Sequence, residues 1–322
     1  MSSVRPQTTP PGRFYALKTH LALLAVQLAF GSQAVEAKVV MSPRIEGGEG
    51  LDPAALAMAR MLGGAVVFQL VHWLGRAIAR KAPASSDELD RGFRLHARIL
   101  ALSFLGVAAN QALFLAGLRL TTPFGVALLG AAIPVVTAAL AVLFRVEPFR
   151  AHTAIGLALA LGGVLGITGI GQVDKGALLV AINCVAYSAY VVFSRKTIRG
   201  MGAIAFMAWV FTYGAVLFAP LGARPLLAAI PTLTPRGWMF LAYILAVPTV
   251  CAYLLNAWAL GRSGPVLVTV YIYTQPVITA VIAWVQLGHG VALRTLVAGA
   301  FILGGVAVVS LRLRAPVTAR GR

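Results

Sequence analysis

Long apolar stretches recur along the chain, and mostly short polar segments separate them. An α-helix needs about twenty residues to cross a hydrocarbon core of ~30 Å at ~1.5 Å per residue. Each stretch is therefore predicted to be a transmembrane helix of an all-α integral membrane protein, with longer polar connections at 76–98 and 225–236. Ten segments qualify as spans, namely 20–41, 54–75, 97–118, 122–144, 152–170, 176–194, 202–222, 237–260, 264–287 and 292–311.

The second half of the chain repeats the first at an offset of 142 residues, which aligns Pro123 with Pro265 and Pro134 with Pro276. The register continues into the pair of segments at 161–164 and 303–306. Each unit contains five helices, an odd number, so the second copy must enter the membrane from the opposite side. Inverted repeats of this kind are typical of secondary transporters. We therefore expect ten transmembrane helices in two inverted five-helix repeats. The predicted segments are a tail at 1–19, repeats at 20–170 and 176–311, and a basic tail at 312–322.

The matched prolines Pro134 and Pro276 are predicted to bend the fourth and ninth spans. A mid-span proline removes one backbone hydrogen bond, and the freed carbonyl is tolerated at membrane depth only inside the protein or beside a cavity. Their equivalent positions favour a shared role at a substrate site. A purely structural kink is the alternative for either proline.

Charged residues make up only 11% of the chain, yet the net charge is +18, which raises the question of nucleic-acid binding. The positions of the basic residues answer it, because nineteen lie in one set of alternate loops and tails and six in the other. Cationic loops stay on the cytoplasmic side. The sequence therefore predicts an inner (plasma) membrane protein with both termini in the cytoplasm, and no nucleic-acid partner. A cleaved signal around 13–30 is the alternative for the first span, but the repeat needs that segment as a helix.

Motifs for other chemistry are missing from the sequence. Cys184 and Cys251 lie in apolar stretches without ligand spacing, so we interpret them as packing residues and expect no metal. The five histidines form no HExxH pattern, and no GxxxxGK[ST] motif occurs that would indicate ATP hydrolysis. We expect no cofactor, no catalytic residue and no enzymatic activity.

Three charged residues, Glu36, Lys38 and Arg60, fall well inside predicted spans. A charge at the bilayer centre costs roughly 2.5–3.5 kcal/mol even on lenient insertion scales, so something must offset it. One hypothesis is a Glu36–Arg60 pair that gates the outer side or handles a proton, with Lys38 nearby. The alternative is that Lys38 and Arg60 extend towards the outer headgroups.

Polar and aromatic side chains within spans are the candidate substrate contacts. Tyr271 and Gln275 are the strongest pair, since positions i and i+4 share one face of an α-helix, here directly before Pro276. Hydrogen bonding between helices is the alternative for each candidate. The full set is Tyr271, Gln275, Asn110, Tyr187, Tyr190, Trp209, Tyr253 and Asn256.

Several short motifs give the chain a family resemblance over about residues 20 to 312. They are Phe30-Gly31-Ser32 followed by Lys38, then Arg60, the Pro134 segment running to Glu147, Ala186-Tyr187 leading to Arg195-Lys196, and the Pro276 segment running to Leu287-Gly288. With the repeat, they make the sequence resemble the drug/metabolite transporter superfamily, specifically the EamA-type exporters, whose ten helices form two EamA repeats. The chain departs from that family in having Phe30 for the usual Trp, His289 where a carboxylate like Glu147 is expected, and an additional Glu36.

The resemblance implies export of small organic metabolites or drugs. The aromatic, sparsely charged interior indicates an uncharged, zwitterionic or hydrophobic solute, moved by alternating access, with proton coupling as one option. Expected partners are a small-molecule substrate and the lipid bilayer, and a homodimer is left open. A non-transporting sensor or assembly factor and a passive facilitator are the alternative functions.

Overall fold

A computed structural model of the chain describes residues 13–79, 86–120, 126, 129–168, 175–275, 277–278 and 293–311. In these ranges every regular element is a helix. The α-helices are α1 (Arg13–Met41), α2 (Pro53–Ala79), α3 (Ser86–Ser103), α4 (Ala109–Leu120), α6 (Ala132–Leu143), α7 (Ala151–Thr168), α8 (Lys175–Met201), α9 (Ala203–Ala229), α10 (Pro235–Ile244), α11 (Ala252–Arg262), α12 (Pro265–Val270) and α14 (Leu293–Leu311). Short π and 3₁₀ segments are η1 (Arg44–Glu46), η2 (Phe104–Ala108), η3 (Ile230–Thr232), η4 (Leu245–Cys251) and η5 (Tyr271–Thr274).

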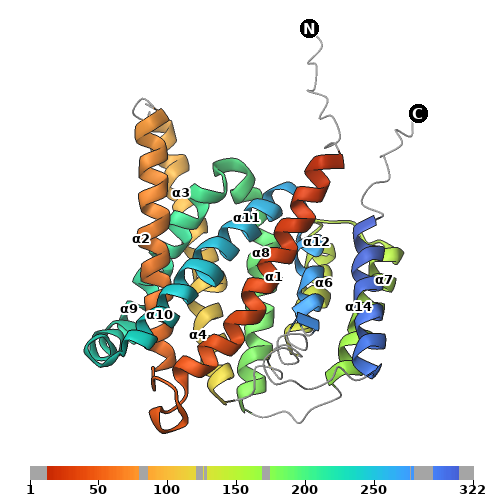
Figure 1. Ribbon diagram of the computed structural model, residues 1–322. Coiled ribbons are helices and arrows are strands. Elements are labelled where there is room, and N and C mark those ends of the chain that lie inside the picture. The colour runs from red at the N-terminus through yellow and green to blue at the C-terminus, as the bar shows by residue number, and fades with distance from the viewer. Residues whose placement is uncertain are drawn as a thin grey trace.

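Six helical segments among the described residues are long and apolar enough to cross a membrane, by length and composition. Three of them are composite, because η2 joins α3 to α4, η4 joins α10 to α11, and η3 continues α9 without a break. Four shorter apolar helices, at 132–143, 151–163, 265–274 and 299–309, lie in the remaining predicted spans. Figure 1 shows that α1 begins and α14 ends on the same side of the molecule.

Two predicted loops are shorter than expected. Helices α2 and α3 extend into the predicted 76–98 connection, so only residues 80–85 between them lie outside the described part. Helix α9 continues through Pro220 and Pro225 to Ala229, well into the predicted 225–236 connection. Hydropathy marks the apolar part of a helix rather than its end, and prolines are tolerated in membrane helices where neighbouring groups satisfy the freed backbone.

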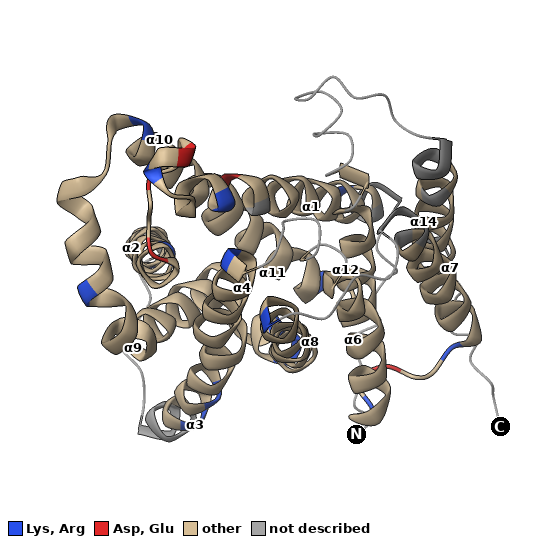
Figure 2. Cartoon of the chain, turned by 90° about the horizontal axis from the view of Figure 1, so that it is seen from below, with Lys and Arg blue, Asp and Glu red and all other residues tan. Residues whose placement is uncertain are grey.

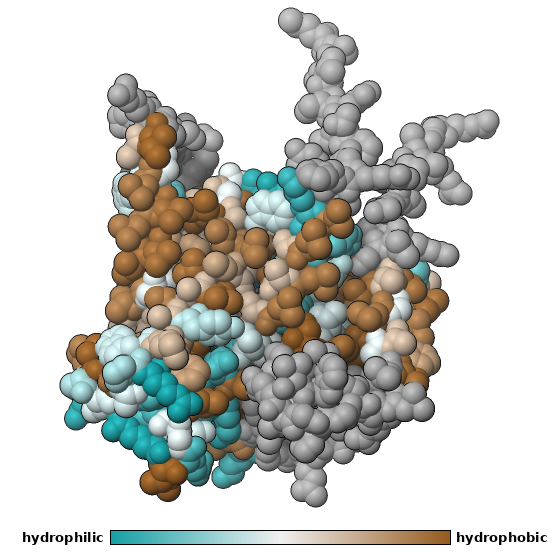
Figure 3. Space-filling model, in the orientation of Figure 1, coloured by the Kyte–Doolittle hydropathy of each residue, from teal (hydrophilic) through white to brown (hydrophobic). Residues whose placement is uncertain are grey.

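Exposed apolar side chains lie along the outer face of α2, as expected for a surface that faces lipid. On α2, Leu62, Val66, Leu70 and Leu74 are exposed at four-residue intervals, so they form one stripe. Figure 3 shows hydrophobic side chains over the middle of the face that carries α2 and hydrophilic ones at its lower end. Seen from below, the charged positions lie mainly at helix ends and in connections (Figure 2).

Small residues bring pairs of helices into close contact. A Cβ added to Gly117 of α4 would lie 3.0 Å from the Gly176 carbonyl of α8. Helices α7 and α14 lie side by side (Figures 1 and 2), and a Cβ on Gly305 would lie 2.4 Å from the Gly156 carbonyl. Membrane helices associate largely through close van der Waals contacts of this kind, because lipid tails are as apolar as the side chains and the hydrophobic effect does not drive the helices together.

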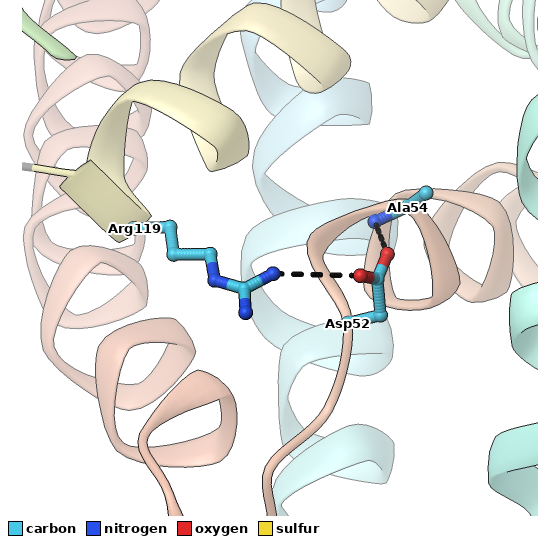
Figure 4. A network of polar contacts seen from close by, with 3 residues as sticks. All are labelled: Asp52, Ala54 and Arg119. Atoms are coloured by element: carbon cyan, nitrogen blue, oxygen red, sulfur yellow. Dashed lines mark hydrogen bonds and ion pairs between the residues drawn. The ribbon is translucent and has the colours of Figure 1, made fainter. Parts of the chain in front are cut away.

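Polar contacts fasten the connection between α1 and α2 to its neighbours. Asp52 caps α2 by accepting from the Ala54 N–H at 2.7 Å, and its other oxygen lies 3.5 Å from Arg119 at the end of α4 (Figure 4). Glu49 accepts from the Thr234 hydroxyl at 2.6 Å and from the Thr234 N–H at 3.2 Å, at the start of α10. These hydrogen bonds from Thr234 lower the pKa of Glu49 below its ordinary value.

Candidate functional site

A cavity of about 100 Å³ lies between α1, α2, α4, α6, α8, α11, α12 and η5. It therefore draws side chains from both halves of the chain. Five of the eight predicted substrate contacts line it: Asn110, Tyr187, Tyr253, Asn256 and Gln275. Its other polar lining comes from Gln27, Gln33, Arg60, Gln111 and Asn183.

The buried guanidinium of Arg60 is held by contacts that originate at a proline inside η4. Pro248 has no N–H group, so it cannot donate the α-helical hydrogen bond to the carbonyl of Ile244, four residues earlier. The Thr249 hydroxyl donates to that carbonyl over 2.7 Å, and its oxygen accepts from Arg60 Nε at 2.9 Å. Arg60 Nη2 donates to Gln33 Oε1 of α1 at 3.0 Å. The helix irregularity thus fixes a charge beside the cavity.

Amide and hydroxyl groups connect the helices around the cavity. Asn110 Nδ2 of α4 donates to Asn183 Oδ1 of α8 at 2.7 Å, and the Tyr253 hydroxyl of α11 lies 3.4 Å from Asn110 Oδ1. On the same wall, Asn256 Nδ2 donates to the Tyr187 hydroxyl at 3.0 Å. These bonds join α4, α8 and α11. The residues therefore line the cavity and also hold the helices together, which is the alternative role that the sequence left open.

Two glutamines of the cavity differ in how their amides are satisfied. Gln275 Nε2 donates to Gln27 Oε1 of α1 at 2.8 Å. Gln111 is 1% exposed, and neither its Nε2 nor its Oε1 has a hydrogen-bond partner in the described part of the chain. Most buried polar groups in proteins are bonded, so this amide requires an explanation.

Three predicted contacts lie elsewhere. The Tyr271 hydroxyl is 2.5 Å from His20 Nδ1, Tyr190 stacks on Phe206, and Trp209 packs edge-on against the ring of His96. Tyr271 and Gln275 both bond to side chains of α1, His20 and Gln27, but only Gln275 lines the cavity. Residues 271–274 form a 3₁₀-helix, so the pair lacks the regular α-helical spacing that the prediction assumed.

The predicted gating residues do not form the expected pair. Arg60 bonds to Gln33 and Thr249, and no ion pair joins it to Glu36 among the described residues. Arg60 is 1% exposed, so it does not extend towards the headgroups either. Lys38 donates to the Leu118 and Arg119 carbonyls at 2.9 and 3.1 Å, where it caps the C-terminal end of α4.

The predicted proline bends are only partly visible. Pro134 lies in the first turn of α6, where a helix needs no N–H donor, and a turn at Ala131 separates α6 from the helical residues 129–130. Cys184 and Ser188 of α8 donate to the nearby carbonyls of Leu129 and Ile133 at 3.3 and 3.2 Å. Pro276 and His289 lie outside the described residues.

Several lining residues were not among the predicted contacts. Gln27, Phe30 and Gly31 lie at spacings i, i+3 and i+4 and so share one face of α1. That spacing, together with the Pro248-Thr249 pair inside an apolar span, is the feature of the sequence from which the α1 side of the cavity could have been predicted.

A second cavity of about 600 Å³ lies where α6 connects to α7, and Glu147, Arg195 and Gly264 line it. Burial raises the pKa of Glu147 above the ordinary value of a glutamate, although nearby Arg195 and a hydrogen bond from the Val266 N–H lower it. A Cβ on Gly264 would lie 1.9 Å from Glu147 Oε1, so glycine leaves room for this carboxylate beside the start of α12.

The described residues contain no group of three His, Cys, Asp or Glu side chains that could hold a metal ion. The first cavity offers amide, hydroxyl and guanidinium hydrogen-bonding groups between aromatic walls. This arrangement suits recognition of a small molecule.

The EamA-like transporter family matches the chain twice, over residues 17–169 and 174–311. The chain belongs to this family. It is 28% identical over 280 residues to YdfC of Bacillus subtilis (strain 168), named an uncharacterized transporter, with 84% of this chain and 86% of that protein covered. A second uncharacterized transporter, from Archaeoglobus fulgidus, is 26% identical over 297 residues, which cover 90% of this chain and 96% of that protein.

A solved crystal structure has the same fold, with a TM-score of 0.69 at 18% identity, and covers 95% of this chain and all of its own. The family matches and the apolar helices together establish a multi-pass membrane protein of the EamA-like transporter family. The resemblance to the drug/metabolite transporter superfamily predicted from the sequence is confirmed.

Proposed function

We propose that the protein is a secondary transporter that exports small organic molecules across the inner membrane by alternating access. The observation that carries this proposal is the cavity between the helices, which is lined by polar groups from both halves of the chain. A volume of about 100 Å³ is below the ~300–1,000 Å³ of typical ligand pockets. The helices must therefore separate to admit a metabolite, as they do in alternating access.

The proposed architecture is ten spans in two inverted repeats. Two separate family matches, each covering about half the chain, support a duplication. Six long and four shorter apolar helices together equal the expected ten. Helix α1 begins and α14 ends on the same side, as an even number of spans requires (Figure 1). The bias of basic loops, nineteen to six, favours placing that side in the cytoplasm.

Glu36 is the proposed proton-handling group of the cycle, because it is the acidic residue of the predicted spans. It lies half-buried on α1, two residues before Lys38, which caps α4, and no ion pair joins it to Arg60 among the described residues. Proton coupling predicts that an imposed pH gradient drives uptake into liposomes and that Glu36→Gln abolishes this dependence. An unchanged pH dependence in Glu36→Gln would remove the residue from the coupling mechanism.

The test of function begins with untargeted metabolite analysis of the medium from overexpressing and deletion strains. Each compound that accumulates outside the overexpressing cells is then assayed for flux in proteoliposomes, with and without a pH gradient. A transporter moves at least one such compound, and a coupled one moves it uphill. Ligand binding without flux would identify a sensor or assembly factor, and flux only down a gradient would identify a facilitator.

A further inference from the structure

Arg60 carries a buried positive charge for which the cavity supplies no counter-ion. It is 1% exposed, and the cavity lining contains no Asp or Glu among the described residues. Of the nine acidic residues in the sequence, Glu36 alone falls within a predicted span, and Arg60 bonds to Gln33 and Thr249 instead. Charges inside membrane proteins are expensive and are commonly paired. A bound anion would pair this charge.

The guanidinium retains donor capacity towards such an anion. Its bonds to Thr249 and Gln33 use Nε and Nη2, and Nη1 makes no hydrogen bond to any residue in the described ranges. Arginine's planar group suits a carboxylate, because its N–H donors match the two oxygens. The unsatisfied amide of Gln111, 1% exposed on the same cavity, is a second observation that points to a ligand.

The remaining walls of the cavity fit an apolar or aromatic body. Phe30 and Tyr253 meet edge to face with ring centroids 5.6 Å apart, and both line the cavity. Phe114 and Ile133 add further apolar surface. Aromatic walls of this kind favour planar ligand groups through stacked or edge contacts.

We propose that the cavity binds small organic monoanions, with a carboxylate on Arg60, a hydrogen bond to Gln111 and an apolar or aromatic body between Phe30, Phe114 and Tyr253. This inference rests on the proposed function only in taking the cavity as the substrate site. It replaces the uncharged, zwitterionic or hydrophobic solute expected from the sequence with one that carries a single negative charge.

The experiment compares binding of carboxylates with their own amides to the full chain in nanodiscs of neutral lipid. The probes are 3-phenylpropanoate, benzoate and octanoate, each paired with its amide, measured by calorimetry. One charge-assisted hydrogen bond is worth about 1.5–3 kcal/mol, so the best acid should bind about 10- to 100-fold more tightly than its amide. Arg60→Gln should abolish that preference, and Arg119→Gln, which changes an exposed arginine outside the cavity, should preserve it.

The proposal is overturned if no acid binds, if acid and amide bind equally, or if Arg60→Gln keeps the preference. The comparison of acid with amide binding to the wild-type protein tests the proposal even where Arg60→Gln fails to fold. Flux assays separate this result from the fate of the proposed function. Acid-selective binding without flux would refute transport alone, and flux with equal acceptance of acid and amide would refute the anion site alone.

Discussion

Gln111→Leu should stabilise the protein while weakening its ligand binding. The Gln111 amide is 1% exposed, and both of its polar atoms lack partners among the described residues. An unsatisfied buried polar group costs about 1–3 kcal/mol, and leucine fills a similar volume without that cost. We therefore expect the free energy of unfolding to rise by about 1–3 kcal/mol. Binding should weaken about 2- to 10-fold, the equivalent of one neutral hydrogen bond.

Asn183→Leu is the matched control, because Asn183 lines the same cavity but its amide oxygen accepts from Asn110 at 2.7 Å. Removing that partner leaves the Asn110 amide donor unsatisfied, so this variant should lose about 1–3 kcal/mol. Both variants are unfolded by titration with SDS in mixed micelles and followed by tryptophan fluorescence. A loss of stability in Gln111→Leu equal to that in Asn183→Leu would refute the argument, since it would mean that the Gln111 amide is satisfied in the folded protein.

Three further changes test other parts of the structure. Burial raises the folded-state pKa of Glu147, so the folded chain holds its proton more tightly. Stability should therefore fall as pH rises above the ordinary pKa of a glutamate and through the folded-state pKa, and Glu147→Gln should remove this fall from SDS unfolding profiles. Gly305→Ala should lower the free energy of unfolding by about 1–3 kcal/mol, because its Cβ would lie 2.4 Å from the Gly156 carbonyl, whereas Gly304→Ala, which meets nothing within 4 Å, should be neutral. Asp52→Asn should change stability by less than about 0.5 kcal/mol, because the carboxylate is exposed and asparagine still caps α2; a larger loss would give the ion pair of Figure 4 a structural role.

The sequence was a good guide to the helices because hydropathy and helix length follow directly from the bilayer. Predicted spans such as 54–75 and 176–194 fall within α2 and α8. Their ends were less predictable, as the continuation of α9 through Pro225 shows, because a helix can extend beyond the apolar layer that hydropathy detects.

The candidate site was predicted in part. Asn110 and Asn256, which were predicted to contact substrate, line the cavity, because polar residues in apolar spans usually face the interior. Tyr271 and Gln275 were predicted to act together; both bond to α1, but Gln275 lines the cavity and Tyr271 does not. The partners of Arg60 were missed because Gln33 and Thr249 come from α1 and η4, and no spacing in one sequence reveals a contact between distant segments.

The partners of Arg60 also suggest how an anion would promote transport. Its guanidinium bonds to Gln33 of α1 and Thr249 of η4, so it joins helices from the two halves of the chain. A ligand shifts an equilibrium between two arrangements only by its difference in affinity for them. Separation of α1 from η4 must break one of these bonds, and a bound carboxylate would compensate for the exposed donor. In the proposed cycle the bound anion therefore lowers the free energy needed to separate α1 from η4, and this separation lets the anion leave. A carrier needs such coupling between binding and rearrangement, whereas a rigid receptor does not.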